Sequence, residues 1–188
     1  AVESLGPHNT GNFFQESTTM ANIAFLGTGL LGGALAEAAA GRGDTVTAWN
    51  RSADKVTALA PFGVKAAATA ADAVRGASRV HLVLKDDAVV DAVLAAALPG
   101  LAPDAIVLDH TTTLPALTAA RADRLAAQGV AYLHCPVFMG PAAARNAQGT
   151  IMVAGPRALF ERVQAALAAM TTRLEFMGER SDLAAANK

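Results

Sequence analysis

The sequence has 188 residues, of which 53% are hydrophobic and 16% are charged, and its formal net charge is -1. This length suits one large domain, and the high hydrophobic content excludes a disordered chain. The near-zero charge gives no reason to expect nucleic acid or a membrane surface as a partner, and no apolar run reaches the ~18 residues that span a bilayer. A single cysteine, Cys135, excludes an internal disulfide and a multi-cysteine metal site. We therefore expect a soluble, cytoplasmic protein without a bound metal.

Residues 1–19 differ from the rest of the chain because they are polar, show no periodicity and lack the apolar core of a signal peptide. Met20 stands directly before the first apolar run, as a natural start would. We expect residues 1–19 to be a disordered leader or tag. No repeat or linker interrupts residues 20–178, which we expect to form one domain.

The most informative stretch is residues 21–33, where an apolar run meets glycines at the spacing G-x-G-x-x-G. The run predicts a buried strand over 23–26, and the following residues predict a helix over 30–42. The first glycine would close a tight turn, the second would let a pyrophosphate approach the backbone, and the third would let the helix pack closely on the strand. The helix N-terminus favours phosphate. An ordinary glycine turn is the alternative. We predict a dinucleotide-binding loop made of Gly27, Thr28, Gly29, Leu30, Leu31 and Gly32.

A second strand, predicted over 45–49, ends at the place where a dinucleotide's ribose is recognised. An NAD site would have a carboxylate here, which would repel a 2′-phosphate, whereas this chain has Asn50 and Arg51. Arg51 can pair with the phosphate, Ser52 can donate its hydroxyl, and Lys55 adds a second positive charge one turn later. Solvated basic side chains at a helix start are the alternative. We predict NADP as the cofactor.

The remaining elements alternate between helix and strand, which predicts an α/β domain with a Rossmann-like, doubly wound parallel sheet and helices on both faces. The predicted helices after the second strand are 55–61, 70–76 with Thr69 as its cap, 88–98, 117–128 and 156–170. The predicted strands are a weak edge strand at 64–67, then 80–84, 105–108, 130–135, 150–154 and 173–177. Residues 136–141 are expected to form an irregular loop.

The loops after the fourth and fifth predicted strands lie at the carboxyl edge of the sheet, where such folds bind their ligands. We expect Leu84, Lys85 and Asp86 to pass over the nicotinamide ribose, although Lys85 also fits a plain solvated charge. Thr111 and Thr112 follow the fifth strand and place hydroxyl groups at the same edge.

Four blocks occur in an order that resembles the nucleotide-binding half of the β-hydroxyacid dehydrogenases. This family includes 3-hydroxyisobutyrate dehydrogenase, 6-phosphogluconate dehydrogenase, glyoxylate/succinic semialdehyde reductases and the related imine reductases. The blocks are the glycine loop; Asp109-His110-Thr111-Thr112 with Pro115; Cys135-Pro136-Val137 with Gly140 and Gly149-Thr150-Ile151-Met152-Val153; and residues 178–188.

The resemblance implies hydride transfer between a nicotinamide and a small carbonyl or β-hydroxyacid substrate. It assigns the general acid and base to Lys188, for which a solvated terminal lysine is the alternative. It assigns contacts with substrate and nicotinamide ribose to Thr111 and Thr112, which also fit a helix cap. Phe138 and Met139, next to Gly140, replace the small residues that hold the family's substrate carboxylate, so a bulkier or more apolar substrate is expected. His134 stands where the family commonly has an aspartate.

The chain stops at Lys188, before the helical domain that normally follows in the family. Residues 179–188 resemble the start of the interdomain helix, so we expect a truncated enzyme, inactive alone, whose full-length form is a homodimer through the absent domain. An imine reductase is the second hypothesis, favoured by the strand end Trp49-Asn50-Arg51-Ser52 and disfavoured by Lys188. A non-catalytic NADP-binding module is the third.

Overall fold

A computed structural model describes residues 20–187, so the expected leader, residues 1–19, and Lys188 both lie outside the described residues. The strands are β1 (Asn22–Leu26), β2 (Thr45–Trp49), β3 (Lys65–Ala66), β4 (Arg79–Leu82), β5 (Ile106–Asp109), β6 (Ala131–His134), β7 (Val137–Phe138), β8 (Thr150–Ala154) and β9 (Arg173–Gly178). The α-helices are α1 (Leu30–Gly41), α2 (Ala53–Thr57), α3 (Ala70–Val74), α4 (Asp87–Ala97), α5 (Pro115–Ala127), α6 (Pro141–Arg145) and α7 (Arg157–Ala168). Short 3-10 helices cover Ala60–Phe62 (η1), Leu98–Gly100 (η2) and Ala185–Asn187 (η3).

The strands form one sheet in the order β3-β2-β1-β4-β5-β6-β8-β7, with β9 also paired to β8. All pairs from β3 to β6 are parallel. The strand order reverses between β1 and β4, so the carboxyl ends of these two strands diverge into loops that leave a crevice. The expected doubly wound architecture is therefore confirmed.

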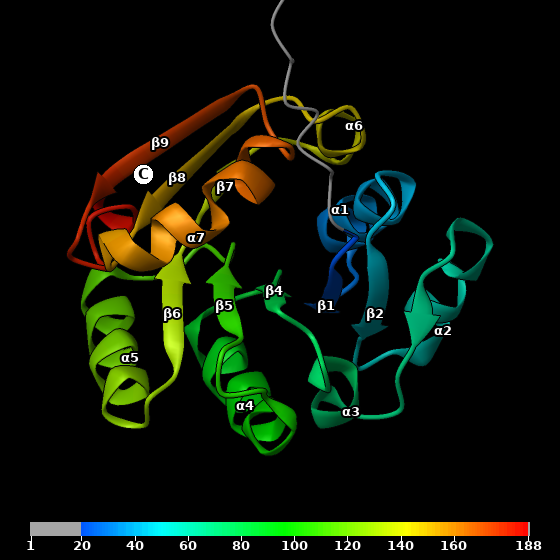
Figure 1. The fold of residues 1–188 in the computed structure, drawn as a ribbon, viewed down its shortest axis with the longest axis horizontal. Coiled ribbons are helices and arrows are strands. Elements are labelled where there is room, and N and C mark those ends of the chain that lie inside the picture. Colours follow the sequence, from blue (N-terminus) through cyan, green and yellow to red (C-terminus); the bar gives the residue numbers. More distant parts are fainter. Residues whose placement is uncertain (1–19, 188) are drawn as a thin grey trace, which may run out of the picture.

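Helices cover both faces of the sheet, as Figure 1 shows, with α1, α6 and α7 on one side and α3, α4 and α5 on the other. A hydrophobic core lies on each face of the sheet, and successive residues of a strand pack alternately into one core and the other. In β1, Ile23 and Phe25 pack toward α1, while Ala24 and Leu26 pack toward α3 and α4. Because β1 is apolar on both faces, it occupies the centre of a sheet that is covered on both sides.

The sheet departs from the expected parallel order after β6. Strand β8 runs antiparallel to both β6 and β7, and β9 runs parallel to β8. The segment expected to be an irregular loop contains β7, which pairs Val137 with Ile151 and Phe138 with Thr150. The helix expected over 55–61 is instead α2 followed by η1. In the part of the chain that the structure describes, no helix is long and apolar enough to cross a membrane.

Candidate dinucleotide-binding site

The glycine loop joins β1 to α1 at the carboxyl edge of the sheet. Gly27 has a φ of +98°, and a Cβ added there would lie 2.3 Å from the carbonyl oxygen of Val83. A Cβ at Gly32 would lie 2.0 Å from the carbonyl oxygen of Gly27. At Gly29 a Cβ would meet no atom within 4 Å, because this glycine faces open space at the start of α1. Two glycines thus permit close backbone packing, and the third keeps a cradle clear before the helix N-terminus.

Asn50, at the end of β2, ties the glycine loop to the loop that begins α2. Its side-chain oxygen accepts a hydrogen bond from the Thr28 N–H at 3.0 Å, and its amide nitrogen donates to the Ser52 carbonyl oxygen at 3.1 Å. Thr28 itself is buried. Asn50 therefore has a bracing role in the described structure, in addition to lining the cleft beside Arg51.

A cleft of about 900 Å³ runs along the carboxyl ends of β2, β1, β4 and β5. The charged residues that line it are Arg51, Lys55 and Lys85, and no carboxylate is among its described lining residues. This composition favours an anionic ligand. The predicted cofactor-binding residues in its lining are Gly27, Gly29, Leu30, Leu31, Gly32, Asn50, Arg51, Ser52, Lys55, Leu84, Lys85 and Thr111.

Two predicted cofactor residues lie elsewhere. Thr28 is part of the glycine loop, but its side chain is buried and is not in the cleft lining. Asp86 caps α4 by accepting a hydrogen bond from the Val89 N–H at 3.0 Å, and it pairs with the exposed Lys85 at 3.9 Å. These two residues are therefore not among the described residues that line the cleft.

Thr111 and Thr112 line the β5 end of the cleft. The Thr111 hydroxyl accepts a hydrogen bond from the Leu84 N–H at 3.1 Å, which joins the loops after β4 and β5. The Thr111 N–H donates to Asp109 at 3.0 Å. Neither threonine is the N-cap of α5, since Leu114 occupies that position. Their alternative interpretation as caps of this helix is therefore wrong.

A buried pair of histidines underlies this end of the cleft. His110 lines the cleft, and its Nε2 lies 2.9 Å from Nδ1 of His81 on β4. The His110 Nδ1 atom lies 2.8 Å from the Cys135 carbonyl oxygen. Burial lowers the pKa of both imidazoles, and for His81 the lowering is large. The prediction that His81 is structural is consistent with its place inside the sheet, stacked on Phe25.

The predicted substrate residues Phe138, Met139 and Gly140 are absent from the cleft lining, where Val137 stands instead. Phe138 is half exposed on β7, and a Cβ at Gly149 would lie 2.7 Å from the Met139 Cβ, so the two segments are in close contact. The structure therefore brings Thr111 and Thr112 to the cleft, and it does not bring this trio there. The predicted catalytic Lys188 lies outside the described residues.

Sequence reasoning missed one wall of the cleft, which is a face of α4 made of small apolar residues. The missed lining residues on this helix are Ala88, Val89, Ala92, Val93 and Ala96. Their spacing of four and their small size were visible in the sequence as one helical face. The reason for the miss is that such a face also fits ordinary core packing.

The parallel sheet, the glycine loop and the cation-lined cleft define a Rossmann-type dinucleotide-binding domain. Comparison with known proteins agrees, since residues 22–178 match the family described as the NAD binding domain of 6-phosphogluconate dehydrogenase. The chain belongs to this family, within the β-hydroxyacid dehydrogenases, and its described residues form an NAD(P)-binding domain.

Individual relatives share this domain over most of the present chain. An uncharacterized oxidoreductase of Shewanella frigidimarina is 32% identical over 163 residues, which are 85% of this chain and 56% of that protein. The human cytokine-like nuclear factor N-PAC is 29% identical over 160 residues, 84% of this chain and 29% of that protein. The structure of an imine reductase from Myxococcus stipitatus in complex with NADP+ has a TM-score of 0.82 and 27% identity, covering 88% of this chain and 57% of that one. The chain thus spans about half the length or less of these relatives.

Proposed function

We propose that this domain binds NADP(H) and serves hydride transfer between the nicotinamide and a small carbonyl or β-hydroxyacid substrate. The observation that carries the cofactor choice is the end of β2, where Arg51, Ser52 and Lys55 line the cleft and none of the described lining residues is a carboxylate. A guanidinium and an ammonium can pair with a 2′-phosphate, whereas an NAD site would use a carboxylate to accept hydrogen bonds from the 2′-hydroxyl. The NADP+ complex of the similar imine reductase supports the same choice.

The described residues fit such a ligand along the whole cleft. The open space at Gly29 and the start of α1 suit a pyrophosphate, and the α4 face suits an apolar or aromatic ring. At the other end, Thr111 and Thr112 are placed to contact the nicotinamide ribose and the substrate. A bound nicotinamide would donate or accept the hydride. Lys188 is the proposed proton donor, because an ammonium beside the carbonyl oxygen can stabilise developing charge and supply the proton.

Cofactor titration tests this proposal, with Trp49 as the reporter, since it is the single tryptophan and lines the cleft. We expect NADPH to bind more tightly than NADH. Arg51→Ala should lose about 1 to 3 kcal/mol with NADPH and little with NADH, because the charged hydrogen bond to the 2′-phosphate is lost. Arg75→Ala is a matched control, since this exposed arginine pairs with Asp72 away from the cleft. Equal affinities of the parent chain for NADPH and NADH would overturn the cofactor proposal.

An imine reductase is the second candidate, favoured by the similar imine reductase structure and by the Trp49-Asn50-Arg51-Ser52 strand end. A non-catalytic binding module is the third, because one relative is named as a nuclear factor. A longer protein that continues past Lys188 distinguishes the three. Reduction of glyoxylate or succinic semialdehyde supports the first candidate, reduction of a cyclic imine supports the second, and NADPH binding without either turnover supports the third.

A further inference from the structure

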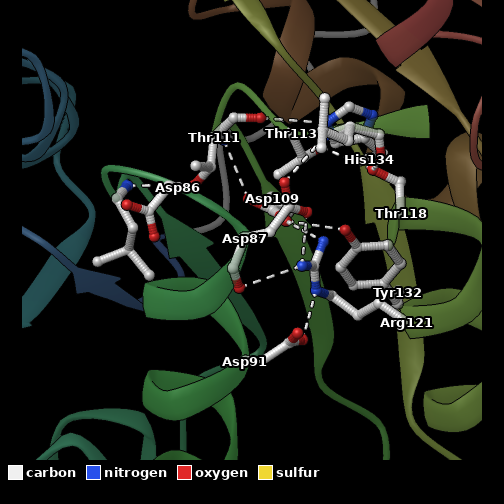
Figure 2. Close-up of polar contacts among 12 residues, drawn as sticks. Asp86, Asp87, Asp91, Asp109, Thr111, Thr113, Thr118, Arg121, Tyr132 and His134 are labelled. Atoms are coloured by element: carbon white, nitrogen blue, oxygen red, sulfur yellow. Dashed lines mark hydrogen bonds and ion pairs between the residues drawn. The ribbon is translucent and has the colours of Figure 1, made fainter. Parts of the chain in front are cut away.

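A fully buried arginine lies behind the cleft. Arg121, on α5, has a side chain with no exposed surface, and its guanidinium contacts three carboxylates (Figure 2). Its Nη2 lies 2.8 Å from Asp87, its Nε lies 2.8 Å from Asp91, and its Nη1 lies 3.8 Å from Asp109. Burial alone would lower the pKa of Arg121, but the hydrogen bonds that it donates to Asp91 and Asp87 raise this pKa, so the side chain stays charged. A buried cation is costly unless it is paired, and the pairs that Arg121 makes link α5 to α4 and β5.

Two of these carboxylates hold the loop that lines the cleft. Asp109 uses its Oδ1 to accept the Thr111 N–H at 3.0 Å, while its Oδ2 accepts the Tyr132 hydroxyl at 2.8 Å and lies 3.8 Å from Nη1 of Arg121, as an ion pair without a hydrogen bond. Asp87 uses its Oδ2 to accept the Leu114 N–H at 2.9 Å, while its Oδ1 faces Arg121. Both ends of the segment 111–114 are therefore tied to carboxylates that share one guanidinium.

The third carboxylate provides an internal comparison. Asp91 lies one turn after Asp87 on α4 and contacts Arg121 at the same 2.8 Å. Its described hydrogen bonds go to Arg121 and, at 2.7 Å, to Arg124. No described hydrogen bond joins Asp91 to segment 111–114. Asp87 and Asp91 thus share the arginine but differ in their contact with the cleft loop.

The hydrogen bonds of this network to segment 111–114 lie at one end of the cleft. Segment 111–114 follows β5, whereas Arg51, Ser52 and Lys55 follow β2, three strands away in the sheet order. Adjacent strands are ~4.8 Å apart, which separates the two ends by about 14 Å. A displacement of segment 111–114 would therefore weaken the binding of the nicotinamide half of a dinucleotide more than the binding of the half that carries the 2′-phosphate.

We propose that Arg121 is a positioning residue that holds Thr111 and Thr112 in place through Asp109 and Asp87, and so sets the affinity for the nicotinamide half of the cofactor. The inference rests on the proposed NADP(H) function. It extends that function because the residue acts from outside the cleft, without touching the ligand.

The test compares two carboxylate variants with two ligands. Asp87→Ala and Asp91→Ala are titrated with NADPH and with adenosine 2′,5′-bisphosphate, which lacks the nicotinamide half. We expect Asp87→Ala to weaken NADPH binding tenfold or more and to change binding of the bisphosphate less than twofold. Asp91→Ala should change both affinities less than twofold. Circular dichroism melting checks that both variants are folded, and a general loss of structure would weaken the two ligands alike.

Arg121 itself is tested by Arg121→Met, which keeps the volume without the charge, and by Arg121→Lys. A folded methionine variant should behave as expected for Asp87→Ala, with NADPH binding weakened tenfold or more and binding of the bisphosphate changed less than twofold. The lysine variant should recover some NADPH affinity because it keeps the positive charge. The recovery should be incomplete, because one ammonium cannot bridge both carboxylates.

The outcomes separate this inference from the function on which it rests. A parent chain that binds neither ligand would overturn the NADP(H) proposal, and this inference with it. The positioning role alone would be overturned if the parent chain binds both ligands and Asp87→Ala weakens the binding of both ligands equally, or of neither. Asp91→Ala showing the same split as Asp87→Ala would also overturn it, because the loop contact would then be irrelevant.

Discussion

The buried histidine pair predicts a loss of stability as the pH falls below about 6.5. A carbonyl oxygen only accepts, so the His110 nitrogen beside the Cys135 carbonyl must carry a hydrogen. The other nitrogen of neutral His110 then accepts from His81, which leaves both rings neutral. Burial is the main cause that lowers the pKa of His81 well below its ordinary value, and the positive charge that His110 gains when it is protonated lowers it further. The native state therefore resists protonation of His81, whereas the unfolded state accepts the proton.

The size of this effect follows from linkage. A group whose pKa is lowered by folding contributes stability that is present above its unfolded pKa, ~6.5 for histidine, and is lost as the pH falls toward its folded pKa. The loss approaches 1.36 kcal/mol per pH unit, so His81 alone contributes about 1.4 kcal/mol between pH 7.5 and 5.5. His110, whose pKa is also lowered by burial, adds to this in the same direction. For a chain of this size, 1.4 kcal/mol lowers the melting temperature by about 3 to 6 °C.

Thermal melts at pH 7.5 and 5.5, followed by circular dichroism, measure the effect in the parent chain and in His81→Leu. Leucine fills the site without a titratable group, so the variant should lose about 1.4 kcal/mol less stability between the two pH values than the parent. Titrating groups that do not contact His81 are common to both proteins and cancel in the comparison, whereas His110, whose Nε2 lies 2.9 Å from His81, loses this partner in the variant. If the two proteins lose stability in parallel, His81 does not stay neutral in the native state, and the reasoning is refuted.

Two further predictions concern the glycine loop and the proposed proton donor. Gly32→Ala should destabilise the fold by about 1 to 3 kcal/mol, because its Cβ would lie 2.0 Å from the Gly27 carbonyl oxygen, whereas Gly29→Ala should leave the melting temperature unchanged and weaken NADPH binding. Melting and titration of both variants check this, and similar melting temperatures would contradict it. In a longer protein that continues past Lys188, Lys188→Ala should reduce turnover by about 10² to 10⁴ while NADPH binding persists. Unchanged turnover would assign the proton to another group.

Local signals in the sequence predicted much of the fold. The strand at β1 could be placed because its residues are apolar on both faces and end at a glycine. The start of α3 could be placed because threonine is a good cap, and the Thr69 hydroxyl indeed accepts the Asp72 N–H at 3.0 Å. The cleft-lining glycines could be predicted because their spacing reflects backbone contacts within one strand-loop-helix unit.

Features set by distant partners could not be predicted in this way. An apolar strand such as β8 has the same composition whether it runs parallel or antiparallel to its neighbour, so its reversal had no local signal. Arg121 has no distinguishing signal in the sequence, because its partners Asp87 and Asp91 are on another helix. The position of Phe138 outside the cleft lining depends on the pairing of β7 with β8, which is also a long-range contact.

The glycine loop is held firmly by the protein itself, and this has a consequence for the thermodynamics of binding. The Gly27 N–H donates to the Trp49 carbonyl oxygen at 2.9 Å, and the Thr28 N–H donates to Asn50 at 3.0 Å. The loop is thus ordered during folding, so a ligand need not freeze it on arrival. Removing the Asn50 side chain would therefore leave the loop less ordered before binding. Association would then carry a larger entropic penalty, in addition to the loss of any contact that Asn50 itself makes with the ligand.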